Sequence, residues 1–247
     1  MAVVEQTIDI IGDDAFCAII LGRSIPGGMP VDIYDTDLRK LRNHALRNMS
    51  GLESVSFPNV TSVGSYAFAE CPNLKRASLP LVTSLPERVF FSNSSLEELD
   101  LPKVTSIGQF CISGKALKRL ELPSLTTTGN SGLILYSLPA LEEVIVPRLA
   151  TVGKTTFHTC TALKQMDLPS AVSLGSQFLS GCKALEVVNI GPNLKTIDST
   201  AFQETPDGLV INLSIAEGEI AGAPWGAPNA IINYEVPYSG KVPMPES

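Results

Sequence analysis

The chain has 247 residues, of which 44% are hydrophobic and 17% are charged, and this composition supplies ample apolar material for a continuous core. Its net charge of −7 disfavours nucleic acid and anionic membrane surfaces as partners, because both are bound through clusters of basic residues. The longest uninterrupted apolar run, residues 15–21, is far shorter than the ~20 residues that span a bilayer, so no direct membrane insertion is expected.

Residues 1–28 are predicted to form a degenerate first turn, or N-terminal cap, followed by a loop. The segment Ile11-Gly12-Asp13-Asp14-Ala15-Phe16 carries a corner pattern that returns further along the chain, and a loop around Pro26-Gly27-Gly28 follows it. The opening residues lack the basic and apolar regions of a secretory signal. We therefore expect either that a leader precedes this sequence, giving a secreted or cell-surface protein, or that the chain is not exported by that route.

Residues 29–208 are predicted to consist of repeats of about 22 residues. In one repeat, Leu52, Val55 and Phe57 are predicted to point inward from a β-strand, while Ser54 and Ser56 point the other way. Pro58 ends the strand because proline has no N–H to donate. The leucines that open the strands follow one another at intervals of 22, 22, 21, 24, 22 and 22 residues, at Leu52, Leu74, Leu96, Leu117, Leu141, Leu163 and Leu185.

The second half of each repeat predicts a short strand and a corner. In Val60-Thr61-Ser62-Val63-Gly64 the two valines suit an inward-facing second strand, and the glycine is expected to permit a reversal of the backbone. Ala67-Phe68 then indicates a helical or 3₁₀ turn that presses its aromatic ring into the core. The corresponding rings of other repeats are Phe90, Phe157 and Phe202.

The consensus L-x-x-L-x-L-P-x-V-x-S-I-G-x-x-A-F-x-x-C extends over roughly residues 29–213 and resembles the BspA-like leucine-rich repeat family. The resemblance implies an α/β repeat fold, a right-handed leucine-rich-repeat solenoid. A parallel β-sheet would form its concave face, with short strands and helical or 3₁₀ turns on the convex side. It also implies a non-catalytic role in adhesion or protein binding on a gut-type bacterium, with a host or cell-surface protein as partner. It implies no enzyme.

Residues 209–235 are predicted to form a C-terminal cap, since the exposed end of a solenoid core must be covered. Residues 209–213 replace the last full strand, and the following segment contains Trp225, the single tryptophan. This closing segment is similar to tails of repeat proteins encoded by phages and prophages of gut bacteria. A structural or receptor-binding component of a phage therefore stands as the alternative function, with a virion or cytoplasmic location. Residues 236–247 are expected to be a frayed tail or linker.

Stacked repeats would place outward-facing strand residues in columns. The column after each leading leucine alternates in charge through Glu53, Lys75, Glu97, Lys118, Glu142, Lys164 and Glu186, which predicts a ladder of ion pairs worth about 0.2–1 kcal/mol each. The two columns beside it supply the candidate binding residues, an acid-leaning stripe on the concave face of Arg76, Glu98, Asp100, Arg119, Glu121, Glu143, Ile145, Gln165 and Asp167. Purely structural cross-strand pairing is the alternative explanation for the charged columns.

No motif for catalysis or for a cofactor is found in the sequence. The patterns G-x-x-x-x-G-K-[ST], G-x-G-x-x-G, H-E-x-x-H and G-x-S-x-G are absent, so neither a catalytic residue nor a cofactor is predicted. Asp100 and Glu121 alone would offer a cation two or three ligands, and no metal site is expected. Cys71, Cys160 and Cys182 share one repeat position, which predicts a column of buried free thiols, with a Cys160–Cys182 disulfide as the alternative. The oligomeric state is left open.

Overall fold

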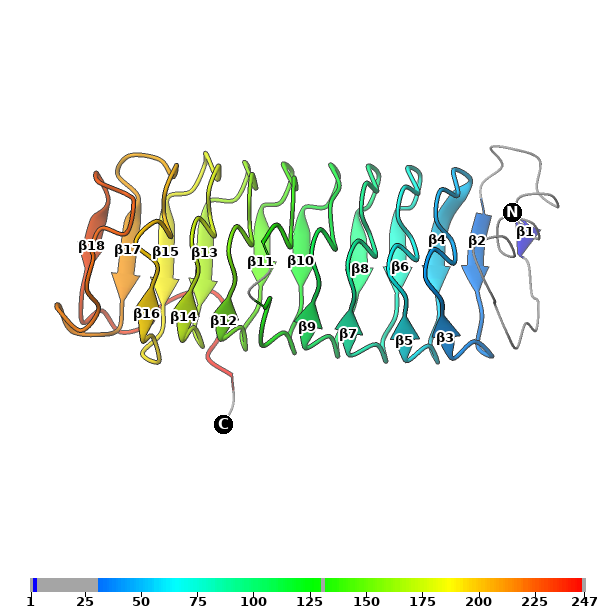
Figure 1. Cartoon of the computed structure of the whole chain (residues 1–247), viewed down its shortest axis with the longest axis horizontal. Coiled ribbons are helices and arrows are strands. Elements are labelled where there is room, and N and C mark those ends of the chain that lie inside the picture. The colour runs from blue at the N-terminus through cyan, green and yellow to red at the C-terminus, as the bar shows by residue number, and fades with distance from the viewer. Residues whose placement is uncertain (1, 4–30, 130–131, 246–247) are drawn as a thin grey trace.

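The computed structural model describes residues 2–3, 31–129 and 132–245, and these form a parallel-strand β-solenoid of about nine turns. The turns stack in a single row along the long axis of the molecule (Figure 1). The predicted solenoid of stacked parallel strands is therefore confirmed. The predicted first turn around residues 11–16 lies outside the described residues.

One row of strands runs along the whole stack, and we call it the main row. It consists of β1 (Ala2–Val3), β2 (Val31–Tyr34), β4 (Leu52–Ser56), β6 (Arg76–Ser78), β8 (Glu98–Asp100), β10 (Arg119–Glu121), β11 (Glu143–Ile145), β13 (Gln165–Leu168), β15 (Val187–Ile190), β17 (Val210–Leu213) and β18 (Ile231–Asn233). Its hydrogen-bonded sheets run in the orders β1-β2-β4-β6-β8, β10-β11 and β13-β15-β17-β18. Pairing is parallel, and equivalent residues of successive repeats face each other, as Arg76 and Glu98 do.

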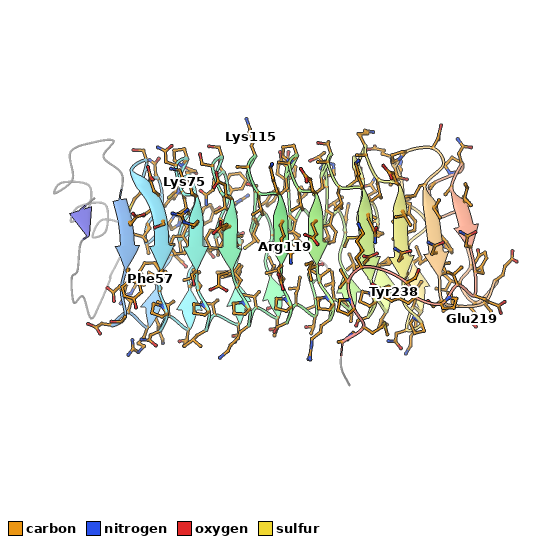
Figure 2. All side chains as sticks on the ribbon, turned by 180° about the vertical axis from the view of Figure 1, so that it is seen from behind. Phe57, Lys75, Lys115, Arg119, Glu219 and Tyr238 are labelled. Atoms are coloured by element: carbon orange, nitrogen blue, oxygen red, sulfur yellow. The ribbon has the colours of Figure 1, made fainter. Side chains whose placement is uncertain are left out.

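A second row of two-residue strands forms the neighbouring side of the solenoid (Figures 1 and 2). It consists of β3 (Lys40–Leu41), β5 (Ser62–Val63), β7 (Ser84–Leu85), β9 (Ser106–Ile107), β12 (Thr151–Val152), β14 (Ser173–Leu174) and β16 (Thr196–Ile197). These strands correspond to the predicted second strand of each repeat. Leu85 and Ile107 face each other in register and are both buried, so this row also contributes to the core.

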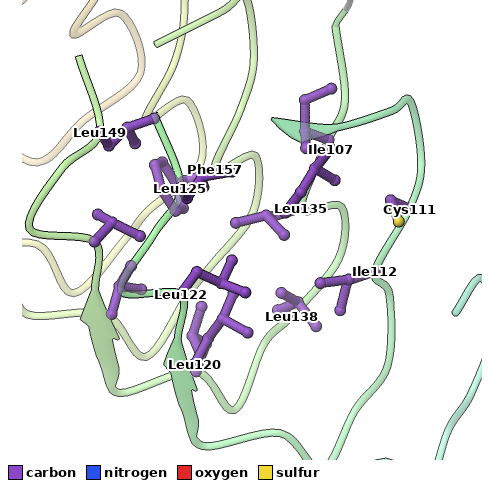
Figure 3. Packing of buried hydrophobic residues seen from close by; sticks show 14 of the residues in the cluster. Ile107, Cys111, Ile112, Leu120, Leu122, Leu125, Leu135, Leu138, Leu149 and Phe157 are labelled. Atoms are coloured by element: carbon purple, nitrogen blue, oxygen red, sulfur yellow. The ribbon is translucent and has the colours of Figure 1, made fainter. Parts of the chain in front are cut away.

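The core is continuous from turn to turn, because one repeat cannot bury its own apolar side chains without its neighbours. Leu120, Leu122 and Leu125 of one turn all point into it and are buried (Figure 3). The predicted core phenylalanines Phe68, Phe90, Phe157 and Phe202 are fully buried. Trp225 is also fully buried and lies beside Phe202 at the C-terminal end of this core, with ring centroids 6.4 Å apart.

The predicted helical or 3₁₀ turns on the convex side are wrong, since the described residues contain no helix. The N–H of Phe68 donates to the carbonyl of Val89 in the next turn at 3.0 Å. Tyr66 and Glu70, on either side of it, adopt left-handed conformations with φ of 59° and 60°. An α-helix would direct these N–H groups to carbonyls four residues earlier in the same segment. The turns instead form a hydrogen-bonded ladder between repeats, which we call the turn ladder.

The left-handed conformation recurs along the turn ladder. Besides Tyr66 and Glu70 it is found at His44, Asn48, Arg88, Ser92, Phe110, Leu133, Ser137, Thr155, Thr159, Gln177 and Glu204, and at Gly181. The corner glycines have a different role from the one expected, because Gly64 and Gly108 are not left-handed. A Cβ built on Gly64 would lie 2.3 Å from the backbone nitrogen of Asn43, so close approach of the neighbouring turn excludes a side chain there.

Candidate functional site

The candidate residues lie on the solvent side of the main row, which we call the outward sheet face. Seven of them are accessible on β6, β8, β10 and β11: Arg76, Glu98, Asp100, Arg119, Glu121, Glu143 and, half-buried, Ile145. The strands hold these side chains outward because residues two apart in a strand share a face, while the residues between them point into the core. With four carboxylates and two guanidinium groups, this accessible stretch carries a formal charge of −2.

Arg119 lies at the centre of the accessible stretch (Figure 2). Its Nη2 is 3.0 Å from Oε2 of Glu121 on the same strand, and its Nη1 is paired with Glu143 on the next turn. The hydrogen bonds to Glu143 and then to Glu121 raise the pKa of Arg119. All three side chains are about half exposed, and pairs of this kind contribute about 0–1 kcal/mol to stability. The cluster is therefore accessible to a partner and adds little to the fold.

Asp100 also bonds along the stack. Its Oδ2 accepts a hydrogen bond of 2.6 Å from the hydroxyl of Ser78 one turn away. Over the described part of the chain, no group of three or more His, Cys, Asp or Glu side chains is placed to hold a metal ion.

The alternating column forms a shorter ladder than the sequence predicts. Nζ of Lys75 lies 3.1 Å from Oε2 of Glu53, and among the described residues this is the one pair of that column within ion-pair distance. The side chains of this column are long and solvated, so holding each pair in one geometry costs rotamer entropy that the screened attraction does not offset. The predicted continuous ion-pair ladder is wrong for the remaining turns.

Gln165 and Asp167 on β13 lie beneath the C-terminal segment. The Asp167 carboxylate accepts hydrogen bonds from Nδ2 of Asn189 at 2.7 Å and from Nε2 of Gln165 at 2.9 and 2.8 Å to its two oxygens. The backbone N–H groups of Lys241 and Val242 donate to its Oδ2 at 2.7 and 3.3 Å. Asp167 is 4% exposed as a result. Hydrogen bonds from Val236, Lys241 and Val242 therefore hold residues 236–242 on the solenoid, where a frayed tail or linker was expected.

Asn189 belongs to an amide ladder that the sequence analysis missed. Each Nδ2 donates to the side-chain oxygen one turn earlier, from Asn233 to Asn212 at 2.9 Å, from Asn212 to Asn189 at 2.8 Å, and from Asn189 to Asp167. The sequence does contain a pattern that predicts this ladder. The three asparagines follow Asp167 at close to the repeat spacing and so belong to the same outward column.

The turn ladder carries a second group of residues that the sequence analysis missed, a column of aromatic and cationic side chains. The rings of His44 and Tyr66 stack 4.7 Å apart, and the guanidinium of Arg88 lies 5.3 Å from the Tyr66 centroid and 4.9 Å from that of Phe110. Such contacts contribute about 0.5–1 kcal/mol each at exposed sites, and here they link successive turns. A recess of about 180 Å³ lies nearby, lined by Phe91, Ser92, Ser94, Ser113, Gly114, Lys115, Tyr136 and Ser137.

Cys160 is fully buried, which fits the expected thiol column. The four described cysteines, Cys71, Cys111, Cys160 and Cys182, are free and buried, so no disulfide joins Cys160 to Cys182. Burial raises the pKa of Cys71 to about 11 and that of Cys111 to about 12, and the contact with Cys182 together with burial raises the pKa of Cys160. A thiol attacks as its thiolate, so Cys71, Cys111 and Cys160 are unreactive at neutral pH. The hydrogen bond with Cys160 lowers the pKa of Cys182.

The described residues include no helix of the length and hydropathy needed to cross a membrane.

No curated protein matches the chain significantly. Three solved structures are similar to it. A leucine-rich repeat protein of T. pallidum has 18% identity and a TM-score of 0.46, with 75% of each chain covered. One of Bacteroides ovatus has 17% identity and a TM-score of 0.37, with 83% of each chain covered. A leucine rich cell surface protein of Faecalibacterium prausnitzii has 17% identity and a TM-score of 0.34, with 92% of this chain and 83% of that one covered.

A family model described as a BspA type leucine rich repeat region matches the chain in six copies, over residues 31–134 and 90–209. These matches span well over half of the sequence, and they include every strand from β2 to β16 and the buried phenylalanines of the core. The chain therefore belongs to the BspA-type leucine-rich repeat family.

Proposed function

We propose that this chain is a non-catalytic protein-binding module of a bacterial surface protein, and that it holds its partner on the outward sheet face between β6 and β11. Leucine-rich repeat solenoids serve as protein-interaction scaffolds, because stacking presents an extended, regular surface. The observation that carries the proposal is the accessible cluster around Arg119, whose ion pairs contribute little to stability.

The charge of this stretch indicates the partner's chemistry. Its formal charge of −2 favours a protein surface that carries more basic than acidic groups, with acids placed to meet Arg76 and Arg119. The strands β6, β8, β10 and β11 stand about 4.8 Å apart, so the stretch is only about 15–20 Å long. A standard interface covers about 800 Å² on each partner, so the contact must extend onto flanking columns.

A capture assay with matched variants tests this proposal. The immobilised chain is exposed to protein fractions from host-cell surfaces and from bacterial cell walls, at low and at physiological salt. We expect a protein that is captured by the wild type, and lost when Asp100→Lys and Glu121→Lys reverse two of the acids of the face. Lys115→Glu is the control, since Lys115 lies beside the recess of the turn ladder. Loss of capture by the control, with retention by the double variant, would move the binding surface to the turn ladder.

A further inference from the structure

The C-terminal segment crosses the outward sheet face and occupies part of it. We call residues 236–245 the docked tail. The segment returns from β18 along the stack to β13 (Figure 2). There the consecutive N–H groups of Lys241 and Val242 donate to the Asp167 carboxylate, and the Val242 side chain is 4% exposed. Asp167 therefore contacts a segment that lies more than 70 residues away in the sequence.

The docked tail is shaped to fit this carboxylate. The Tyr238 hydroxyl donates to the carbonyl of Val242 at 2.6 Å and so closes the segment into a compact loop. A Cβ built on Gly240 would lie 2.7 Å from Oδ1 of Asp167 and 2.4 Å from the Tyr238 hydroxyl oxygen. No residue with a side chain fits at that position without a shift, which explains the glycine. The contacts therefore select a tyrosine, a glycine two residues later, and an apolar residue two residues after that.

The carboxylate is arranged in advance for such a segment. Gln165 and Asn189 hold it through their side-chain amides, and the amide ladder behind Asn189 continues to Asn233. A buried carboxylate needs several donors, and two backbone N–H groups complete the set here. The tail supplies these two donors from its backbone, at Lys241 and Val242.

We propose that Asp167, with Gln165 and Asn189, forms a peptide-binding site whose built-in ligand is the docked tail. A partner protein would bind there, after displacing the tail, through an extended segment of the pattern tyrosine–x–glycine–x–valine. This inference rests on the proposed function, since the site lies on β13, next to the accessible stretch that ends on β11. A tethered tail acts at an effective concentration on the order of millimolar. A partner segment therefore displaces the tail only when the rest of the face binds the partner as well. The tail thus excludes proteins that carry the segment but do not fit the face.

The test uses the full-length chain and a fluorescent synthetic peptide of residues 236–245, with the dissociation constant measured by fluorescence anisotropy. Val242→Asp is the releasing variant, because it replaces a buried apolar side chain with a charged one at the residue whose N–H donates to Asp167. We expect this variant to bind the wild-type peptide at least ten-fold more tightly than the wild-type chain does. Lys241→Ala is the matched control, and its tail should stay docked and exclude the peptide as the wild type does. Adding Asp167→Asn to Val242→Asp should weaken peptide binding at least ten-fold.

Three results would overturn the proposal. The first is equally weak peptide binding by the wild-type and Val242→Asp chains when their circular dichroism spectra agree. The second is tight peptide binding that persists after Asp167→Asn is added to Val242→Asp, and the third is a Lys241→Ala chain that binds the peptide as tightly as Val242→Asp does. A wild-type dimer in sedimentation that Val242→Asp converts to monomer would show that the tail is exchanged between two copies. That result would also overturn the proposal. The measurement needs no natural partner, so its failure is distinct from a failure of the capture assay.

Discussion

The rings of Phe68 and Phe90 lie one turn apart and stack almost parallel, with centroids 5.2 Å apart and an interplanar angle of 6°. Both side chains are fully buried. The N–H of Phe68 is fixed to Val89 and that of Phe90 to Cys111 by inter-turn hydrogen bonds of 3.0 and 2.7 Å. The stacked rings therefore sit in a frame that cannot close around a missing side chain.

Phe90→Ala is expected to lower the free energy of unfolding by about 3–5 kcal/mol, because the cavity between two hydrogen-bonded turns cannot collapse. Urea unfolding followed by circular dichroism measures the loss. Phe91→Ala is the matched control, since the same ring is removed from a half-buried position next along the chain. Equal losses for the two variants would contradict the placement of Phe90 in the core.

Thr159 has a φ of 58°, a left-handed conformation that is unfavourable for a β-branched residue. Thr159→Asn is expected to raise the free energy of unfolding by about 1 kcal/mol, because asparagine tolerates this conformation. Thr161→Asn, at an exposed position that is not left-handed, serves as the control and should give no gain. If Thr159→Asn lowered the free energy of unfolding as much as Thr161→Asn does, or more, the left-handed conformation at Thr159 would be contradicted.

The two ends of the amide ladder are expected to respond differently to truncation. Asn189 is 6% exposed, donates to Asp167 and accepts from Asn212, so Asn189→Ala removes one donor from the buried Asp167 carboxylate and the acceptor of the Asn212 side-chain amide. We expect a loss of about 2–3 kcal/mol in the free energy of unfolding. Asn233→Ala removes an exposed terminal member and should cost less than about 1 kcal/mol. Thermal or urea unfolding distinguishes them, and similar costs would argue against a buried network.

The buried thiol of Cys111 makes stability depend on alkaline pH. Burial raises its pKa to about 12, above the ordinary value near 9, so the folded chain holds this proton more tightly than the unfolded chain does. The contribution of this protonated thiol to the free energy of unfolding is complete below about pH 9 and is lost as the pH rises toward 12. Between pH 8 and pH 11 the loss should be about 2–3 kcal/mol. Cys111→Ala removes this component, so its free energy of unfolding in urea should fall less steeply over the same interval. Identical slopes for the two proteins would contradict the burial of the thiol.

The repeat period predicts most of the solenoid, because the same apolar pattern must satisfy every turn. Val55 and Phe57 point inward as their alternation indicates, and Leu52 is also buried because the pairing register shifts by one residue after it. Arg76 and Glu98 face each other because they occupy equivalent positions. The turn around Phe68 was misassigned because its local sequence is compatible with a helix, and only the neighbouring turn supplies the competing hydrogen-bond partners.

The candidate site was predicted only in part for a similar reason. The outward position of Arg119 follows from strand alternation within one repeat. The contact between Asp167 and Lys241 joins a repeat to a non-repeating tail, and no periodicity connects the two. A buried carboxylate in an outward column has no local signature, because its burial comes from a segment more than 70 residues away.

Site-specific photo-crosslinking to the captured partner tests the central claim most directly. A photoreactive residue is placed at Glu98 on the outward sheet face in one chain and at Lys115 near the turn ladder in another, and the crosslinked partner is detected by mass spectrometry. The account predicts an abundant crosslink from position 98 and none from position 115. A crosslink from position 115 with none from position 98 would contradict it.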